Sequence, residues 1–425
     1  MVLFLLLAVA IVLCVLHYKR IVHLPFLDGV IPQESTVDSS SEDSSLEDSS
    51  SEDSSLGSSS EDSSTESSVE TSSSDSSSID EETFGIGGVM TNADIQTVSG
   101  SSVSIHFLEL GNKYTGDCTL IKVGNTEVLI DAGSRQSSAS TINAYLEDYC
   151  TDGVLEYVVA THAHQDHIAG FVGTSSKGAY NGVLYTYQVG TLIQFSKTNL
   201  TAYNKNNNLT LYGKYLEAVE YAQSKGTSVY NAIDCWNNAN GASRSYTLGA
   251  GVTLNILYQK YYEESTSDEN DYSVCTLVQD GERNYLFTGD LEEHGEESLV
   301  ESNTLPKCEL FKGGHHGSPT SSNTSLLEAI QPEIVCVCCC CGSTEYTENI
   351  ANVFPSQAFV DRIAKYTDKV YVTTIIDGES FASMNGNIVL YVDNGKLNLR
   401  CSNNVTKFKD TAWFLENRVM PDEWK

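Results

Sequence analysis

The sequence is poor in positive charge. Its 425 residues include only 24 Lys and Arg against 57 Asp and Glu, for a formal net charge of −33. This balance excludes a basic protein that coats nucleic acid, because such proteins present Lys and Arg to the phosphates. A second long apolar run is also missing, which excludes a multi-pass transporter or channel. Apolar residues still make up 40% of the chain, which is enough for a sizeable core and excludes a wholly disordered protein.

The twelve cysteines lack the arrangement of a disulfide framework. Eleven lie beyond the N-terminal apolar run, an odd number without regular spacing. Five of them fall in the run Cys336-Val-Cys-Cys-Cys-Cys341, which at first sight resembles a metal site. Adjacent side chains of a strand point to opposite faces, so this run cannot close one tetrahedral site. We interpret it as a buried strand of small apolar side chains, and the many free thiols indicate a reducing or anaerobic setting.

The one long apolar run is Val2–Leu16. It is short for a membrane-spanning helix, but no basic residue precedes it and no A-x-A-like exit follows it, as a signal peptide requires. We therefore interpret residues 1–20 as a hydrophobic membrane anchor, with a signal segment as the alternative. Lys19 and Arg20 favour a cytoplasmic domain, whereas the acidic stalk that follows favours the cell surface. We expect a membrane-anchored protein at the cell surface, and leave cytoplasmic orientation and secretion open.

Residues 21–82 form a linker rich in Ser, Asp and Glu. Sixteen acidic residues and no Lys or Arg lie between Glu34 and Glu82. Such a segment cannot bury enough apolar surface to offset its conformational entropy, and its like charges keep it extended. We expect a disordered tether, and a calcium-binding or partner-binding role is the alternative.

From Ser104 onward, short apolar strands alternate with helices, and polar clusters follow the strands. The pattern predicts strands at 104–110, 118–123, 127–130, 155–160, 252–257, 273–278, 285–288, 308–311, 334–341, 370–374, 388–392 and 396–399. It predicts helices at 138–149, 211–224, 291–300, 326–330 and 357–366. This order suits an α/β sandwich with its site along one edge of the sheets. We place the folded domain at 83–400 and a C-terminal extension at 401–425.

Histidines gather at one point of the folded part. The motif His162-x-His164-x-Asp166-His167 directly follows the apolar strand predicted at 155–160. A strand end is rigid enough to hold ligands and open enough to reach solvent. Imidazole and carboxylate suit zinc, and also manganese or iron. Two such ions about 3.5–4 Å apart can clamp both oxygens of a displacement, so the motif predicts a divalent-metal site.

The segment Thr161-His-Ala-His-Gln-Asp-His-Ile-Ala-Gly170 resembles the signature of the metallo-β-lactamase-fold superfamily. Within it, the chain looks closest to the hydrolase domain of ComEC-type DNA-uptake proteins, over roughly residues 103–395. The other matching elements, in the order of that branch, are Phe107-Leu-Glu-Leu-Gly with Gly116-Asp-Cys-Thr-Leu-Ile121, Leu129-Ile-Asp-Ala-Gly133, Asn270-Asp-Tyr-Ser-Val274, Leu286-Phe-Thr-Gly-Asp-Leu-Glu292 and Gly314-His-His-Gly-Ser318. The resemblance implies a four-layer αββα sandwich, and the anchor and the linker lie outside it.

The resemblance also implies a set of metal ligands. His162 and His164 would hold the first of two divalent ions, zinc by preference with manganese as the alternative. Asp166 and His167 would hold the second ion, and Asp290 would bridge the two.

The resemblance implies further roles for residues near these ligands. One of His315 and His316 would complete the second metal site; we favour His316 as the ligand and place His315 near the substrate. Asp131 would orient the ligand imidazoles without touching the metal, and Asp117 would lie near the substrate. Asp166 and His315 are the candidates for moving the proton.

The chain departs from the wider superfamily in one respect. Another His usually completes the first metal site, but no His occurs from residue 168 to 293. The first metal would then have only His162, His164, Asp290 and water. We expect it to be the weaker site, and occupancy by a single ion stays open.

Three residues near these motifs are interpreted as structural. His294 lies in an acidic helix start, where we expect no metal role, and His106 lies within a strand, where we expect a packed core histidine. Lys312 precedes the His pair, and we expect it to face solvent, with a place near an anionic substrate as the alternative.

Together these features predict a hydrolase that uses a metal-activated water, with phosphodiester bonds, small or polymeric, as the leading substrate. Fold alone does not name a substrate, so a lactonase or esterase of the same fold is the alternative. A metal-containing binding domain without turnover is the third possibility. The net charge and the lack of a basic stripe oppose strong nucleic-acid binding, and the oligomeric state is left open.

Overall fold

The computed structural model describes residues 84–425, so the predicted anchor (1–20) and linker (21–82) lie outside the described residues. The described residues fall in the second of two compact units, Ser76–Lys425. Within them, no helix combines the length and the apolar character that crossing a bilayer demands.

Two mixed β-sheets form the centre of the described residues. The first has nine strands: β1 (Phe84–Val89), β19 (Lys396–Cys401), β18 (Ile388–Asp393), β2 (Ser104–Phe107), β3 (Thr119–Val123), β4 (Thr126–Ile130), β5 (Val154–Ala160), β8 (Gln188–Gln194) and β9 (Ser228–Asn231), in that spatial order. The second has eight: β10 (Ser245–Gly249), β11 (Val252–Leu257), β12 (Cys275–Asp280), β13 (Arg283–Phe287), β14 (Leu310–Lys312), β15 (Ile334–Cys341), β16 (Val370–Asp377) and β17 (Ser380–Ser383). A small hairpin joins β6 (Ser175–Ser176) to β7 (Ala179–Tyr180).

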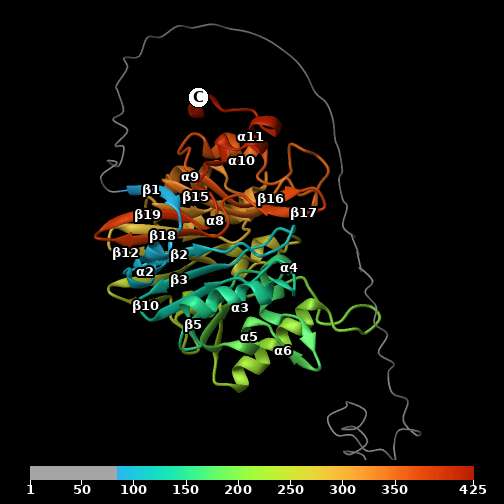
Figure 1. Cartoon of the computed structure of the whole chain (residues 1–425). Helices are drawn as coiled ribbons and strands as arrows, with labels where there is room; N and C mark the ends of the chain where they lie inside the picture. The colour runs from blue at the N-terminus through green and yellow to red at the C-terminus, as the bar shows by residue number, and fades with distance from the viewer. Residues whose placement is uncertain (1–83) are drawn as a thin grey trace, which may run out of the picture. The chain divides into compact units, whose positions relative to one another are not determined.

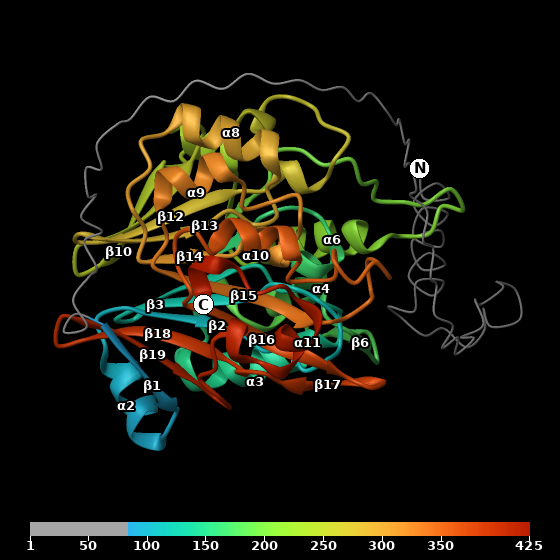
Figure 2. The same cartoon turned by 90° about the horizontal axis from the view of Figure 1, so that it is seen from above.

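Helices lie outside the two sheets (Figures 1 and 2). The α-helices are α2 (Asn92–Gly100), α3 (Ser138–Tyr149), α4 (Gln165–Val172), α5 (Val183–Thr186), α6 (Leu211–Ser224), α7 (Ala232–Asn237), α8 (Glu293–Ser302), α9 (Thr324–Ile330), α10 (Gln357–Ile363) and α11 (Ala412–Asn417). Short 3-10 turns are η2 (Lys260–Tyr262), η3 (Asn270–Tyr272), η4 (Gly314–Gly317), η5 (Phe408–Asp410) and η6 (Asp422–Trp424). In Figure 2, α3 lies on the outer side of the first sheet, and α8 and α9 lie on the outer side of the second. This layering confirms the predicted mixed α/β sandwich.

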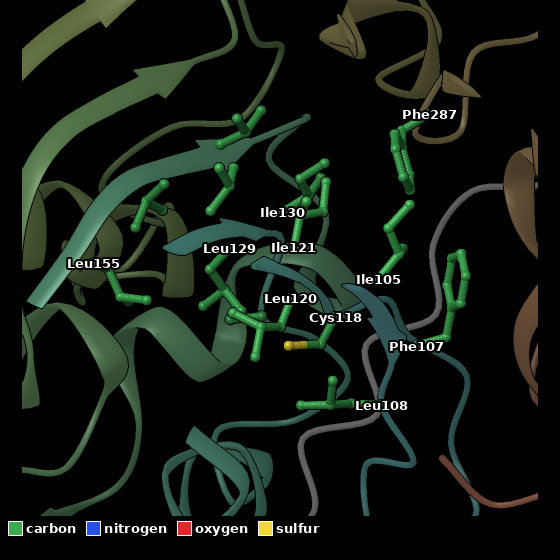
Figure 3. Packing of buried hydrophobic residues seen from close by; sticks show 14 of the residues in the cluster. Ile105, Phe107, Leu108, Cys118, Leu120, Ile121, Leu129, Ile130, Leu155 and Phe287 are labelled. Carbon is green, nitrogen blue, oxygen red and sulfur yellow. The ribbon is translucent and has the colours of Figure 1, made fainter. Parts of the chain in front are cut away.

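The main apolar core fills the space between the sheets. Side chains of β2 and β3 on one face of the first sheet, such as Ile105 and Ile121, share a buried cluster with side chains of the second sheet, such as Leu254 and Phe287 (Figure 3). The same cluster continues on the other face of the first sheet, where it includes Ile142 and Leu146 of α3. Burying side chains of this size contributes about 1.5–3 kcal/mol each. The cluster therefore fixes how the two sheets stack, and with it how their strand ends meet.

A second apolar cluster lies between the second sheet and its helices. It includes Leu299 of α8, Leu327 of α9 and Phe359 of α10. The residues after β19 join this cluster through Phe408 and Trp424, which are both buried. The C-terminal residues therefore pack against the folded core.

The cysteine run forms β15, whose eight residues are all buried. Its side chains alternate between the two clusters. Ile334, Cys336 and Cys338 belong to the core between the sheets, whereas Val335, Val337, Cys339 and Cys341 belong to the cluster under the helices. This alternation confirms that the run is a core strand, and it separates the thiols that a single metal site would have to bring together.

Candidate metal centre

The candidate site lies where strands of both sheets end at one edge. Strand β4 runs parallel to β5, and β13 runs parallel to β14, so the carboxyl ends of each pair face the same way. Asp131 follows β4, Thr161 follows β5 and Asp290 closely follows β13. In open α/β sheets, ligands bind at such carboxyl ends.

Antiparallel neighbours bring further polar residues to the same edge. Thr119 at the start of β3 is opposite Ile130 at the end of β4, which places Asp117 close to Asp131 in the sheet. The main chain then ties the turns together, because the Asp117 N–H donates to the Asp166 carbonyl at 3.0 Å. A Cβ at Gly133 would collide with that same Asp166 carbonyl, so glycine is required for the two turns to approach.

Four buried side chains form a group that fits a cation. Ligand atoms of Asp117, His167, Asp290 and His316 all lie within 4.8 Å of one another. The Oδ2 atom of Asp290 is 3.0 Å from Nε2 of His167 and 3.1 Å from Nε2 of His316. Three atoms of the group, Asp117 Oδ1, Asp290 Oδ1 and His316 Nε2, are buried without a hydrogen-bond partner. Unpaired buried polar atoms are costly, and a divalent ion would satisfy them, so the residues present fit a metal.

The other predicted ligands lie beside this group. His162 Nε2 and His164 Nδ1 are 3.0 Å apart, and the His162 ring lies 4.1 Å from the His167 ring, centroid to centroid. The Oδ2 atom of Asp166 is 3.3 Å from Nε2 of His316. The fold thus brings together all six predicted ligands, and it adds the Asp117 carboxylate, which the sequence analysis placed near the substrate.

Asp131 holds one of the imidazoles in place. It accepts the Thr161 N–H at 2.8 Å and the Thr161 hydroxyl at 2.7 Å, and it lies 2.8 Å from His167 Nδ1. These contacts fix His167 with Nε2 facing Asp290. Such carboxylate–imidazole contacts set the tautomer and orientation of metal-binding histidines.

Two residues that the sequence analysis left without a role hold other members of the group. The hydroxyl of Ser273 accepts the N–H of Asp290 at 3.0 Å and lies 3.4 Å from His162 Nδ1. The backbone carbonyl of Cys338 lies 2.8 Å from His316 Nδ1. Ser273 belongs to a motif that the resemblance had marked, whereas no local pattern marks a backbone carbonyl.

The neighbouring charges and burial shift the pKa values of the histidines in different directions. Burial alone would lower the pKa of His167 and His316, but Asp290 and other carboxylates outweigh it and hold both pKa values well above the ordinary value. Burial and the neighbouring imidazoles hold the pKa of His162 well below its ordinary value, which leaves that ring neutral. A neutral imidazole is the form that binds metals.

His315 lies at the margin of the group. Its side chain is 19% exposed, and its Nε2 is 3.9 Å from Asp290 Oδ2. On its other side, Nδ1 lies 3.2 Å from Glu292 Oε1, and Glu292 also accepts the Thr320 hydroxyl at 2.7 Å. Glu292 therefore orients His315 with Nε2 toward the site.

An aromatic pair lies beside the same group. The Tyr346 hydroxyl donates to Asp166 Oδ2 at 2.7 Å although the residue is 52% exposed. Its ring lies 5.6 Å from that of Phe354, which in turn lies 6.1 Å from the His316 ring. Tyr346 follows β15 in a loop, where no sequence pattern pointed to the site.

The structure also tests the predicted surroundings of the three residues that the sequence analysis interpreted as structural. His106 is fully buried and lies 2.8 Å from both the Tyr145 hydroxyl and the Ser104 hydroxyl, which confirms a packed core histidine. His294 is exposed in the first turn of α8, as predicted. The prediction for Lys312 is wrong: its side chain is only 3% exposed and pairs with Asp117, because β14 ends inside the site rather than at the surface.

Comparison with known proteins confirms the resemblance that the motifs predict. Residues 111–200 match the family profile described as the Metallo-beta-lactamase superfamily. Recombination protein 2 of Haemophilus influenzae is 30% identical over 110 residues, 26% of this chain and 13% of that protein. Competence protein ComA of Neisseria gonorrhoeae is 30% identical over 129 residues, 30% of this chain and 17% of that protein. ComE operon protein 3 of Bacillus subtilis is 32% identical over 69 residues, 16% of this chain and 9% of that protein. The chain thus spans less than a fifth of each relative.

The structure of this chain resembles solved structures only weakly. The metallo-beta-lactamase fold protein YhfI of Bacillus subtilis has a TM-score of 0.35 at 11% identity, over 65% of this chain and 96% of that one. The short form of human tRNase Z has a TM-score of 0.33 at 13% identity, over 64% of this chain and 92% of that one. At these scores, neither likeness carries an argument about the site.

Proposed function

We propose that the described part of the chain is a metal-dependent hydrolase of phosphodiester bonds. The observation that carries the proposal is the buried group of Asp117, His167, Asp290 and His316, in which three possible ligand atoms make no hydrogen bond. A structural cluster would satisfy these atoms within the protein. The group lies at a strand-end edge beside the partly exposed His315, so a substrate can reach it.

Two divalent ions would be held by the residues that converge here. His162 and His164 would take one ion, and Asp166, His167 and His316 the other, with Asp290 between them. Imidazole and carboxylate ligands suit zinc first and manganese second. Such ions, when bound, supply an acidified water and positive charge for the phosphate oxygens.

The chain's own residues orient the reaction and move the proton. Glu292 holds Nδ1 of His315, so that Nε2 of His315 can give a proton to the leaving oxygen. Asp166 accepts the Tyr346 hydroxyl, so that the phenol fixes the Asp166 carboxylate at the mouth of the site. Both predicted catalytic residues thus have a partner that sets their direction.

A phosphodiester is favoured over a lactone by the relatives, which are named for recombination and competence. The acidic charge of the chain repels a long polyanion, which favours a small phosphodiester over tight binding of nucleic acid. A lactonase or esterase of the same fold is the second candidate, because the group itself does not distinguish ester chemistries.

The test is hydrolysis of bis-p-nitrophenyl phosphate by the full chain with added zinc or manganese. Asp290→Ala should abolish the rate, and Asp148→Asn, on the exposed side of α3, should leave it unchanged. A chain that binds metal but hydrolyses no phosphodiester would overturn the proposal. A lactone or carboxylic ester substrate then separates the second candidate from a binding domain without turnover.

We also place the protein at the cell surface, held by residues 1–20 through the acidic linker. The support is the apolar run Val2–Leu16 and the absence of Lys and Arg from 21 to 82. Protease added to intact cells should remove the folded part from a surface-anchored protein. Protection from protease would favour the cytoplasmic orientation, and recovery in the medium would favour secretion.

A further inference from the structure

Lys312 is a buried cation inside the group of metal-binding side chains. It ends β14, its side chain is 3% exposed, and its ammonium pairs closely with Asp117 Oδ2. The same ammonium lies 3.5 Å from Asp290 Oδ1 and donates to the Gly289 carbonyl at 3.3 Å. Lysine is almost never fully buried unless it is paired, so this position is held by the two carboxylates.

The two oxygens of Asp290 face different partners. Oδ2 faces the imidazoles of His167 and His316 at 3.0 and 3.1 Å. Oδ1 faces Lys312 and has no hydrogen-bond partner that meets ordinary geometry. The ammonium therefore competes with a metal for Oδ1 of Asp290, while Oδ2 faces the two imidazoles.

The two carboxylate oxygens of Asp117 also face different partners. Its Oδ2 pairs with Lys312, while its Oδ1 lies 3.2 Å from His316 Nδ1 and belongs to the group that fits a cation. Lys312 thus places a positive charge between the Asp117 and Asp290 carboxylates.

We infer that Lys312 is a positioning residue that competes with the metal for carboxylate oxygens. It pairs with Oδ2 of Asp117 and lies 3.5 Å from Oδ1 of Asp290, so a metal must compete with the ammonium for these two oxygens. In this way Lys312 weakens the affinity for the metal and keeps Asp290 in one orientation for turnover. This inference rests on the metal site of the proposed function, but not on its substrate.

The experiment measures zinc and manganese affinity by competition with a chromophoric chelator, for three variants of the full chain. Lys312→Met frees two carboxylates, so the metal should bind about tenfold or more tightly. Asp117→Asn leaves the ammonium with Asp290 alone, so the metal should bind about tenfold or more weakly. The double variant removes both charges of the pair and should return close to the affinity of the unchanged chain.

The double variant also guards against misfolding, because it buries no unpaired charge. A Lys312→Met chain that binds metal no more tightly, or a double variant that fails to restore the affinity, would overturn the inference. Phosphodiester turnover is measured separately and should fall in Lys312→Met despite the tighter metal. If the unchanged chain binds metal but hydrolyses no phosphodiester, the proposed function fails while the affinity series still tests Lys312.

Discussion

The backbone carbonyl of Cys338 lies 2.8 Å from Nδ1 of His316. This contact leaves Nε2 of His316 facing Asp290, and it distinguishes His316 from its sequence neighbour His315. The two rings lie in a turn with left-handed backbone at both residues, so consecutive side chains point to different surroundings. His316 is fully buried, whereas His315 contacts Glu292 at the margin.

The His pair should therefore separate metal binding from turnover. His316→Ala should lower metal affinity, because it removes a donor from the centre of the group. His315→Ala should keep its metal content and lose about 10²-fold or more in kcat, the usual size of a lost general acid. Metal analysis beside steady-state kinetics checks this, and equal metal loss in both variants would contradict it.

Asp131 should act through His167 rather than on the substrate. Asp131→Asn weakens the contact at His167 Nδ1, so metal affinity should fall about 10–100-fold. The matched control is Asp148→Asn on the exposed side of α3, which should leave affinity unchanged. Chelator competition measures both, and a lower kcat with unaltered affinity would show that Asp131 has a different role.

Glu296 should make stability depend on pH. It is fully buried in α8, and its burial raises the pKa of the carboxyl from 4.5 to about 7, although the N–H groups of Asn323 and Ser322 oppose that rise. Because the folded pKa is the higher one, the folded state holds a proton that the unfolded state has lost. The stabilising contribution of this proton is full below about pH 4.5 and is lost as pH rises through about 7.

Urea unfolding with a chelator present, at pH 5 and pH 8, tests this coupling. The unchanged chain should lose roughly 2–3 kcal/mol more than Glu296→Gln between these two values. The glutamine variant carries no titrating group there, so the remaining pH dependence cancels in the comparison. Parallel pH dependence in both chains would rule the coupling out.

Arg418 should hold the loop that carries Tyr346. Its guanidinium donates to three main-chain carbonyls of this loop, those of Ile350 at 2.9 Å, Val353 at 2.5 Å and Pro355 at 2.9 Å, and to that of its neighbour Asn417 at 2.8 Å. Arg418→Met leaves these carbonyls unpaired, so unfolding free energy should fall by roughly 2–4 kcal/mol.

The control for that variant is Arg400→Met on β19. Arg400 pairs with Asp94 only at 3.5 Å, so its loss should cost about 0–1 kcal/mol. Limited proteolysis should cut the 342–356 loop sooner in Arg418→Met than in Arg400→Met. Equal stability and equal cleavage in the two variants would show that the loop is held by other contacts.

The sequence predicted the interior of the fold better than its edges. Helices α3 and α6 have the predicted bounds, and β5, β11 and β15 coincide with apolar runs that the sequence analysis predicted to be strands. Strands β9 and β17, with the sequences Ser-Val-Tyr-Asn and Ser-Phe-Ala-Ser, were missed, and so were β1 and β10. These four are edge strands, and half-exposed edge strands carry no continuous apolar run that would mark them. The interior strand β8 was also missed, because its apolar residues are interrupted by Gly190 and Thr191.

By itself, the sequence determined the six candidate ligands and their order along the chain, because each ligand follows an apolar strand within a short motif. Only the tertiary structure decided which side chains meet across the sheets. Lys312 and Asp117 stand 195 positions apart in the sequence, and Tyr346 and Asp166 stand 180 apart. Such pairs follow from the stacking of two sheets on a shared core, which no local pattern records, and so a lysine expected in solvent became the buried cation of the site.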